Sequence, residues 1–135
     1  MILIDDKKKY PNPKNLNNLR FKEYRHFLNL ENLNNISCIF HQGACSDTME
    51  YDKKFMMDTN FEYSKKIFSV AIKNSAKFIY ASSASVYGLN KNSEEVEENE
   101  SPLNVYAESK LLFDKYIIVS YTHLRAHETQ THLVC

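Results

Sequence analysis

The chain has 135 residues, of which 43% are hydrophobic and 13% aromatic, so it can bury the core of one domain. Its 17 basic and 17 acidic residues cancel, which gives no electrostatic reason to expect nucleic acid or an anionic membrane surface as a partner. No apolar run approaches the roughly 20 residues of a membrane helix and no leader pattern follows Met1, so we expect a soluble, cytoplasmic protein.

The first expected element is a short apolar strand over residues 1–4, which ends at Asp5 and Asp6. A carboxylate at the end of such a strand can bind the adenosine ribose of a dinucleotide. Three lysines follow directly at residues 7–9 and offer positive charge for a 2′-phosphate, although a solvated loop is the favoured explanation of this run. This segment is therefore a candidate cofactor contact that leaves NAD and NADP both open.

Two further strand-length apolar runs lie at residues 36–40 and 77–81, separated by a long helical pattern from 47 to 74. Asp47, followed by Glu50 three residues later, has the spacing of a helix-capping pair. An acidic, polar loop at 92–101 then leads into a second helical pattern over 104–118. This order predicts an α/β fold with a doubly wound parallel sheet, in which ligands lie at the carboxyl ends of strands.

Glycine is scarce, because only Gly43 and Gly88 occur where a domain of this size would carry about nine at the usual frequency. A glycine-rich phosphate loop is therefore absent from this chain. Three cysteines, Cys38, Cys45 and Cys135, have neither the number nor the spacing of a disulfide framework or a zinc site. Reduced thiols and no metal centre are expected.

Tyr106 and Lys110 are spaced i, i+4 at the start of the last expected helix, so their side chains share one helix face. A phenol is a weak base at neutral pH, and a neighbouring ammonium group favours its ionised form. The same Tyr-x-x-x-Lys spacing occurs at Tyr10 and Tyr87, but prolines follow the first and a turn at Gly88 follows the second. Only the pair at Tyr106 lies on a credible helix.

The expected strand at 77–81 runs into YASSASVYG (residues 80–88), where small hydroxyl side chains stand at a strand's carboxyl end. Together with NVYAESK (residues 104–110), this segment resembles the extended short-chain dehydrogenase/reductase family, and the detail of residues 41–66, 77–88 and 102–116 is similar to its ADP-glycero-manno-heptose 6-epimerase branch. The resemblance implies a partial Rossmann-like domain over residues 1–118. It also implies that the first strand, its glycine loop and the substrate domain lie outside this chain.

The resemblance assigns roles to individual residues. It implies that Tyr106 is the catalytic acid/base, that Lys110 binds the nicotinamide ribose and favours the tyrosinate, and that Ser83 hydrogen-bonds the reacting hydroxyl. The cofactor contacts it implies are Asp5, Asp6, Gln42, Gly43, Ala44, Cys45, Ser46, Thr59, Tyr106 and Lys110. It further implies NADP, with NAD as the alternative, an ADP-heptose sugar nucleotide as substrate, and a homo-oligomer for the full-length enzyme.

The composition changes near Val119: Asn and Lys disappear, and His123, His127 and His132 enter. We expect residues 119–135 to be a non-native tail that does not continue the preceding helix; a histidine-rich metal tail is the weaker alternative. Other sugar-nucleotide enzymes of the UDP-galactose 4-epimerase or dTDP-glucose dehydratase type, and a non-catalytic product, remain alternative functions. Without a phosphate loop, this chain by itself is expected to bind cofactor weakly and to show no turnover.

Overall fold

The computed structural model describes residues 1–6, 8–9, 14–18, 20–30, 32–91, 94 and 96–127, with only the backbone described for residue 15 and residues 123–127. The chain divides into two compact units, Met1–Asn34 and Asn35–Cys135. Each unit contains one two-stranded sheet within its described residues. The units are described separately below.

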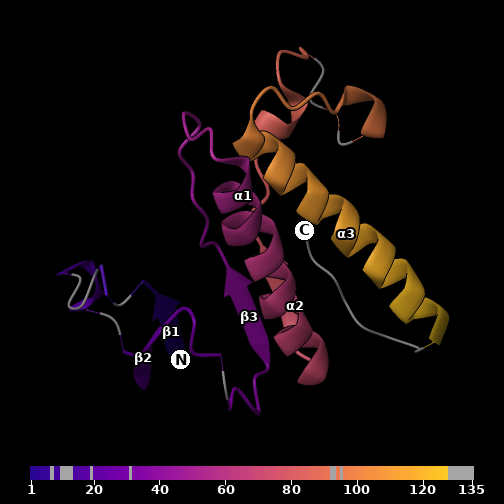
Figure 1. Ribbon diagram of the computed structural model, residues 1–135. Coiled ribbons are helices and arrows are strands. Elements are labelled where there is room, and N and C mark those ends of the chain that lie inside the picture. Colours follow the sequence, from indigo (N-terminus) through magenta and orange to yellow (C-terminus); the bar gives the residue numbers. More distant parts are fainter. Residues whose placement is uncertain are drawn as a thin grey trace. The chain divides into compact units, whose positions relative to one another are not determined.

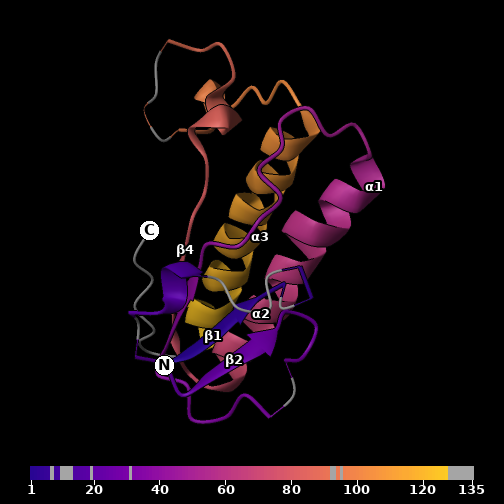
Figure 2. The ribbon, with the colours of Figure 1, turned by 90° about the vertical axis from the view of Figure 1, so that its left-hand side faces the viewer.

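The first unit is built on a parallel pair of strands, β1 (Ile2–Asp5) and β2 (Glu23–His26), and a 3-10 turn, η1 (Lys14–Leu16), lies between them in the chain. The two strands lie side by side in register from Ile2 opposite Glu23 to Asp5 opposite His26 (Figure 2). The sequence predicts β1 but not β2. Strand β2 contains Glu23 and Arg25 and therefore lacks the apolar run by which the other strands were predicted. In the structure these two side chains form an ion pair at 2.6 Å.

The second unit contains the other predicted strands, β3 (Cys38–His41) and β4 (Lys77–Tyr80), which pair in parallel. The parallel pairing of these runs is confirmed. Residues 1–4, also predicted as a strand, form part of β1, which pairs in parallel with β2 in the first unit.

One long helical rod joins β3 to β4 and consists of α1 (Lys53–Met56), a π-helical segment η2 (Met57–Glu62) and α2 (Tyr63–Lys73). It begins later than predicted, because Asp52 is the N-cap and accepts the Phe55 amide hydrogen at 2.9 Å. The predicted capping residue Asp47 instead accepts from the Met49 amide in a local turn. A carboxylate can satisfy a free amide in either setting, so spacing alone misplaced the helix start.

After β4 the chain forms a 3-10 turn, η3 (Ala84–Tyr87), and then a tight connection through Gly88. Gly88 has φ of 58° and ψ of −123°, and a Cβ placed there would lie 2.0 Å from the Ser101 carbonyl oxygen. Only glycine fits this position without a backbone shift. A second 3-10 turn, η4 (Glu97–Asn99), precedes the last helix.

The last helix, α3 (Val105–His127), starts where Asn104 accepts the Ala107 amide hydrogen at 2.8 Å. It continues past Ile118 to His127, so the prediction that the helix stops near residue 118 is wrong. Helix continuation needs only compatible propensities, and residues 119–127 contain neither glycine nor proline. Residues 128–135 lie outside the described part of the chain, as do the side chains of 123–127. Over the part that is described, no helix is both long and apolar enough to span a membrane.

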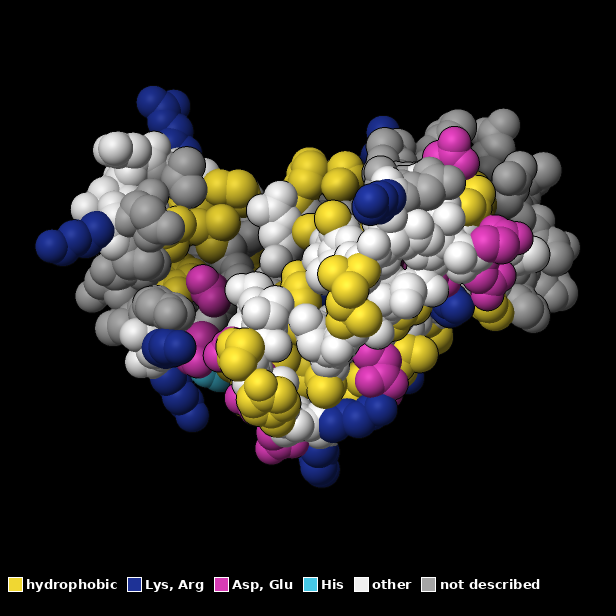
Figure 3. All heavy atoms as spheres, turned by 90° about the horizontal axis from the view of Figure 1, so that it is seen from above, with side chains coloured by type: hydrophobic (Ala, Val, Ile, Leu, Met, Phe, Trp, Pro, Cys, Tyr) yellow, Lys and Arg dark blue, Asp and Glu magenta, His cyan; other side chains and the backbone are white. Residues whose placement is uncertain are grey.

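Aromatic contacts hold α2, α3 and the β3–β4 sheet together. Phe78 on β4 meets Phe68 on α2 with ring centres 5.2 Å apart, and Tyr80 meets Phe113 on α3 at 5.1 Å. Figure 1 shows α1 and α2 alongside β3, with α3 running beside the rod. Apolar side chains also reach the surface, where they are mixed with charged ones (Figure 3). This core fixes the carboxyl end of β4 relative to α3.

Candidate active site

The loop after β3 carries the predicted cofactor residues 42–46. The side chains of Gln42, Ala44 and Ser46 are exposed, Cys45 is half-buried, and no atom lies within 4 Å of a Cβ placed on Gly43. An open loop of small side chains at the carboxyl end of a parallel strand leaves room for a nucleotide to approach the backbone. The loop therefore fits a cofactor-binding role.

Asn60, in the π-helical segment η2, holds this loop in place. Its side-chain oxygen accepts the Cys45 amide hydrogen at 2.8 Å, and its side-chain nitrogen donates to the Cys45 carbonyl at 2.9 Å. The same nitrogen lies 3.0 Å from the Ser109 hydroxyl oxygen, which donates to the Tyr106 carbonyl at 2.7 Å. Asn60 and Ser109 are almost fully buried, so these bonds form a dry link between the loop and the first turns of α3.

Tyr106 and Lys110 lie on α3, as predicted, in its first turns. Tyr106 is half-buried, whereas Lys110 is 6% exposed. Burial lowers the pKa of Lys110, and the carboxylate of Asp114 opposes that change. A buried ammonium needs a compensating anion, and Asp114 lies one helical turn further along the same face.

Ser83 caps the 3-10 turn η3, and its hydroxyl contacts Ser85 at 2.7 Å while accepting the Ser85 amide hydrogen at 3.3 Å. Its neighbour Ser82 donates a hydrogen bond to Asp114 on α3. The strand end that carries Ser83 is therefore attached to the helix that carries Tyr106. The convergence of the Ser83 and Tyr106 hydroxyls on one substrate oxygen stays a prediction.

His41 is the last residue of β3 and directly precedes the loop at residues 42–46. It was not assigned a role from the sequence. Its Nε2 lies 2.7 Å from the Ser64 hydroxyl, and the residue is 8% exposed. Burial, and to a smaller extent the positive charge of Lys110, lowers the pKa of His41 to about 4. The imidazole is therefore neutral at physiological pH and acts as a hydrogen-bonding core residue.

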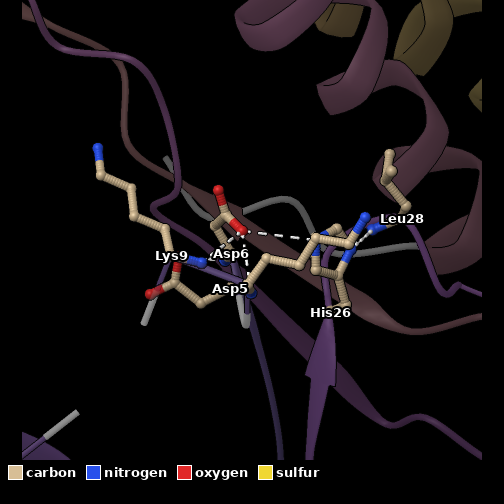
Figure 4. A network of polar contacts seen from close by, with 6 residues as sticks. Asp5, Asp6, Lys9, His26 and Leu28 are labelled. Atoms are coloured by element: carbon tan, nitrogen blue, oxygen red, sulfur yellow. Dashed lines mark hydrogen bonds and ion pairs between the residues drawn. The ribbon is translucent and has the colours of Figure 1, made fainter. Parts of the chain in front are cut away.

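Asp5 and Asp6 belong to the first unit, at the end of β1, and Figure 4 shows their contacts. The Asp6 carboxylate accepts the amide hydrogens of Lys8 and Lys9 at 3.2 and 3.1 Å and pairs with His26 at 3.4 Å. Asp5 is exposed and accepts the Asp6 amide hydrogen at 2.7 Å. The strand end thus presents Asp5 to solvent, while Asp6 stabilises the following turn.

Residues that sequence reasoning missed do most of the positioning. Asn60, Ser109 and Asp114 connect segments that are 15 to 49 positions apart in the chain. The one available signal was a polar amide within the apolar pattern of a predicted helix, because asparagine is a poor helix former. Thr59, the predicted cofactor contact beside Asn60, is half-buried.

A metal site finds no support in the described residues, where no group of three or more His, Cys, Asp or Glu side chains gathers. The side chains of His123 and His127, and all of His132 and Cys135, lie outside the described part of the chain. The histidine-tail alternative therefore stays untested.

A parallel α/β unit with a small-residue loop after one strand, a serine at the end of the next, and a Tyr-x-x-x-Lys helix defines a class of nucleotide-binding enzymes. A family model described as "NAD dependent epimerase/dehydratase family" matches residues 2–125. The chain belongs to the NAD dependent epimerase/dehydratase family.

Individual relatives agree with this assignment. The chain is 47% identical over 126 residues to ADP-L-glycero-D-manno-heptose-6-epimerase of Brachyspira hyodysenteriae. The aligned region covers 87% of this chain and 40% of the relative. It resembles the crystal structure of the Helicobacter pylori ADP-L-glycero-D-manno-heptose-6-epimerase with a TM-score of 0.72 and 28% identity, covering 88% of this chain and 50% of that one. The chain thus spans half or less of the length of these relatives.

A more distant likeness concerns the fold alone. RMD from Pseudomonas aeruginosa, solved with NADPH, matches with a TM-score of 0.60 and 17% identity over 91% of this chain and 50% of that one. The α/β, Rossmann-like fold with parallel strands is thereby confirmed.

Proposed function

We propose that this chain forms part of a nucleotide-sugar epimerase that inverts C6 of an ADP-glycero-manno-heptose by transient oxidation. The observation that carries the proposal is the 47% identity over 87% of the chain to an enzyme of that name.

In this proposal Tyr106 takes the proton of the sugar C6 hydroxyl and later returns it, while Ser83 hydrogen-bonds the same oxygen. The buried Lys110 ammonium stabilises the tyrosinate. A bound nicotinamide cofactor would accept the C6 hydride and give it back to the opposite face of the ketone. Residues 42–46 and Thr59 would hold that cofactor, with Asn60 keeping the loop in position.

We further propose NADP as the cofactor, with NAD as the competing outcome. Lys8 and Lys9 are exposed directly after Asp5 and Asp6 and can meet a 2′-phosphate. If so, replacing both lysines by alanine in the chimera described in the next paragraph weakens NADP binding about tenfold and leaves NAD binding unchanged, as measured by fluorescence titration. Equal effects on both cofactors would contradict the assignment.

The function is tested in a chimera in which this chain replaces the matching segment of the Brachyspira hyodysenteriae relative. NMR should detect inversion at C6 of ADP-glycero-manno-heptose. Tyr106→Phe should lower turnover by at least about 10²-fold, the low end for loss of general acid–base catalysis, and leave cofactor affinity nearly intact. Tyr116→Phe on the same helix is the matched control and should keep full turnover; a Tyr106→Phe variant at the parent rate would remove Tyr106 from the mechanism.

A further inference from the structure

A partly buried carboxylate on α3 has no role in the chemistry proposed above. Asp114 lies four residues after Lys110, and its Oδ2 accepts a hydrogen bond from the Ser82 hydroxyl. Its Oδ1 is buried and has no hydrogen-bond partner of ordinary geometry within the described part of the chain. A buried acceptor without a donor is costly unless a nearby charge compensates it.

Lys110, one helical turn before Asp114 on α3, carries a positive charge on the same face of the helix. Burial raises the pKa of Asp114, whereas hydrogen bonds from Ser82 and Tyr80 and the charge of Lys110 oppose the rise. The influence is mutual, because the Asp114 carboxylate also opposes the lowering of the Lys110 pKa. The two side chains are spaced i, i+4 on α3, so they lie on one face of the helix, where their charges can interact.

Two other titratable groups lie near this pair, His41 and Glu100. His41 on β3 is neutral at physiological pH, since its pKa lies at about 4. Glu100, before α3, raises the pKa of Asp114 but is itself paired with Lys115 at 3.0 Å. Asp114 is therefore the anion that acts on Lys110.

Asp114 also fixes the strand end beside the proposed catalytic serine. Ser82, its hydrogen-bond donor, directly precedes Ser83, and the ring of Tyr80 packs on Phe113, the neighbour of Asp114. One side chain thus touches the end of β4 and acts electrostatically on the lysine of α3.

We propose that Asp114 is a positioning residue that holds the end of β4 through Ser82 and places a negative charge one helical turn from the buried Lys110. The role in catalysis rests on the proposed function, whereas the pairing can be measured without turnover. No direct contact of Asp114 with substrate or cofactor is invoked.

The first test measures Lys110 by NMR in the full 135-residue chain, labelled with ¹³C and ¹⁵N at lysine. Asp114→Asn should lower the Lys110 pKa by about one unit, the low end of the effect of an adjacent opposite charge. Asp58→Asn, which removes the partner of exposed Lys54, is the matched control and should leave Lys110 unchanged. An unchanged Lys110 pKa in Asp114→Asn would overturn the proposal.

Coupling between two sites is reciprocal, so the same interaction can be measured from the other side. If Asp114→Asn does not fold, Lys110→Met should raise the Asp114 carboxyl pKa by a similar amount, followed by ¹³C NMR. An unshifted Asp114 would be equally decisive against the pairing.

The second test uses the pH dependence of turnover in the chimera described above. Because activity requires the Lys110 ammonium, Asp114→Asn should move the alkaline limb of kcat to lower pH by the shift measured for Lys110. A merely structural role would lower kcat at every pH without moving the limb, and would contradict the proposal. Absence of turnover in the unaltered chimera would count against the proposed function alone, since the Lys110 titration decides the pairing independently.

Discussion

At the scale of single residues, buried polar side chains decide how this site is held together. Asn60 uses its amide three times, toward both backbone groups of Cys45 and toward Ser109. The Asn60 side chain is 1% exposed, and leaving a buried polar group unpaired costs more than its hydrogen bond contributes.

Asn60→Asp should therefore be severely destabilising although it preserves size. The carboxylate loses the donor to the Cys45 carbonyl and to Ser109 and introduces a buried negative charge, so the free energy of unfolding should fall by about 2–4 kcal/mol. Urea unfolding followed by circular dichroism measures this, with exposed Asn34→Asp as the control. Equal stability of the two variants would show that the Asn60 bonds contribute little.

His41 predicts how stability depends on pH. Its pKa is about 4 in the folded chain and about 6.5 in the unfolded chain, so between these values only the unfolded state binds the proton. The free energy of unfolding is therefore unaffected by His41 protonation above pH 6.5 and decreases as the pH falls toward 4, by about 3 kcal/mol at most.

Urea unfolding of the parent and of His41→Asn between pH 7.5 and 4.5 tests this prediction. The parent should lose stability more steeply with falling pH than the variant. Parallel pH dependences would mean that His41 is not the group that takes up the proton.

At the scale of elements, the sequence predicted those whose signal is local. The apolar runs of β1, β3 and β4 stand out in the chain, and the helix interiors follow from their apolar spacing. The N-terminus of the first helix and the C-terminus of the last were wrong, because Asp47 and Asp52 are equivalent capping residues by sequence and no breaker follows Ile118. Strand β2 was not predicted because its sequence, EYRH, has no apolar run, and its strand conformation depends on pairing with β1.

The site divides in the same way. The loop at 42–46 and the Tyr106–Lys110 turn were predicted, and the structure links them through Asn60. Asn60, Ser109 and Asp114 could not be assigned a role, because their partners are distant in the chain and become neighbours only after α1, η2, α2 and α3 have packed.

The connection after η3 yields a prediction about glycine. Gly88→Ala forces a Cβ into the Ser101 carbonyl at a positive φ, and should cost about 1–3 kcal/mol for the backbone conformation alone. Gly43→Ala is the matched control, because its Cβ would meet no atom within 4 Å. Thermal unfolding should show a clearly lower Tm for Gly88→Ala only; equal Tm values would refute the steric argument.

At the scale of the whole molecule, the two units differ in what stabilises them. The first spans Met1–Asn34, and its described residues form one pair of four-residue strands, a size at which a sheet by itself is marginal. The second contains the aromatic core around Phe78 and Phe113.

Hydrogen exchange should therefore separate the units. The amides of β1 and β2 should exchange faster than those of β3, β4 and α3, since local opening follows the amount of buried apolar contact. Mass spectrometry of peptic fragments gives the two rates, and Phe113→Ala should accelerate exchange in the second unit. Equal protection of both sheets in the parent chain would contradict this ranking.

The π-helical segment η2 also determines how this region should be compared with its relatives. A π turn holds about one residue more than the α turn it replaces, so α1 is rotated by about 100° relative to an uninterrupted helix. A relative with a plain α-helix here would need a one-residue deletion between Met57 and Glu62. In an alignment, this gap should be placed before or after Asn60 but not at Asn60 itself. The bonds of Asn60 to Cys45 and Ser109 fix its position, whereas the helix on either side of it can change its winding.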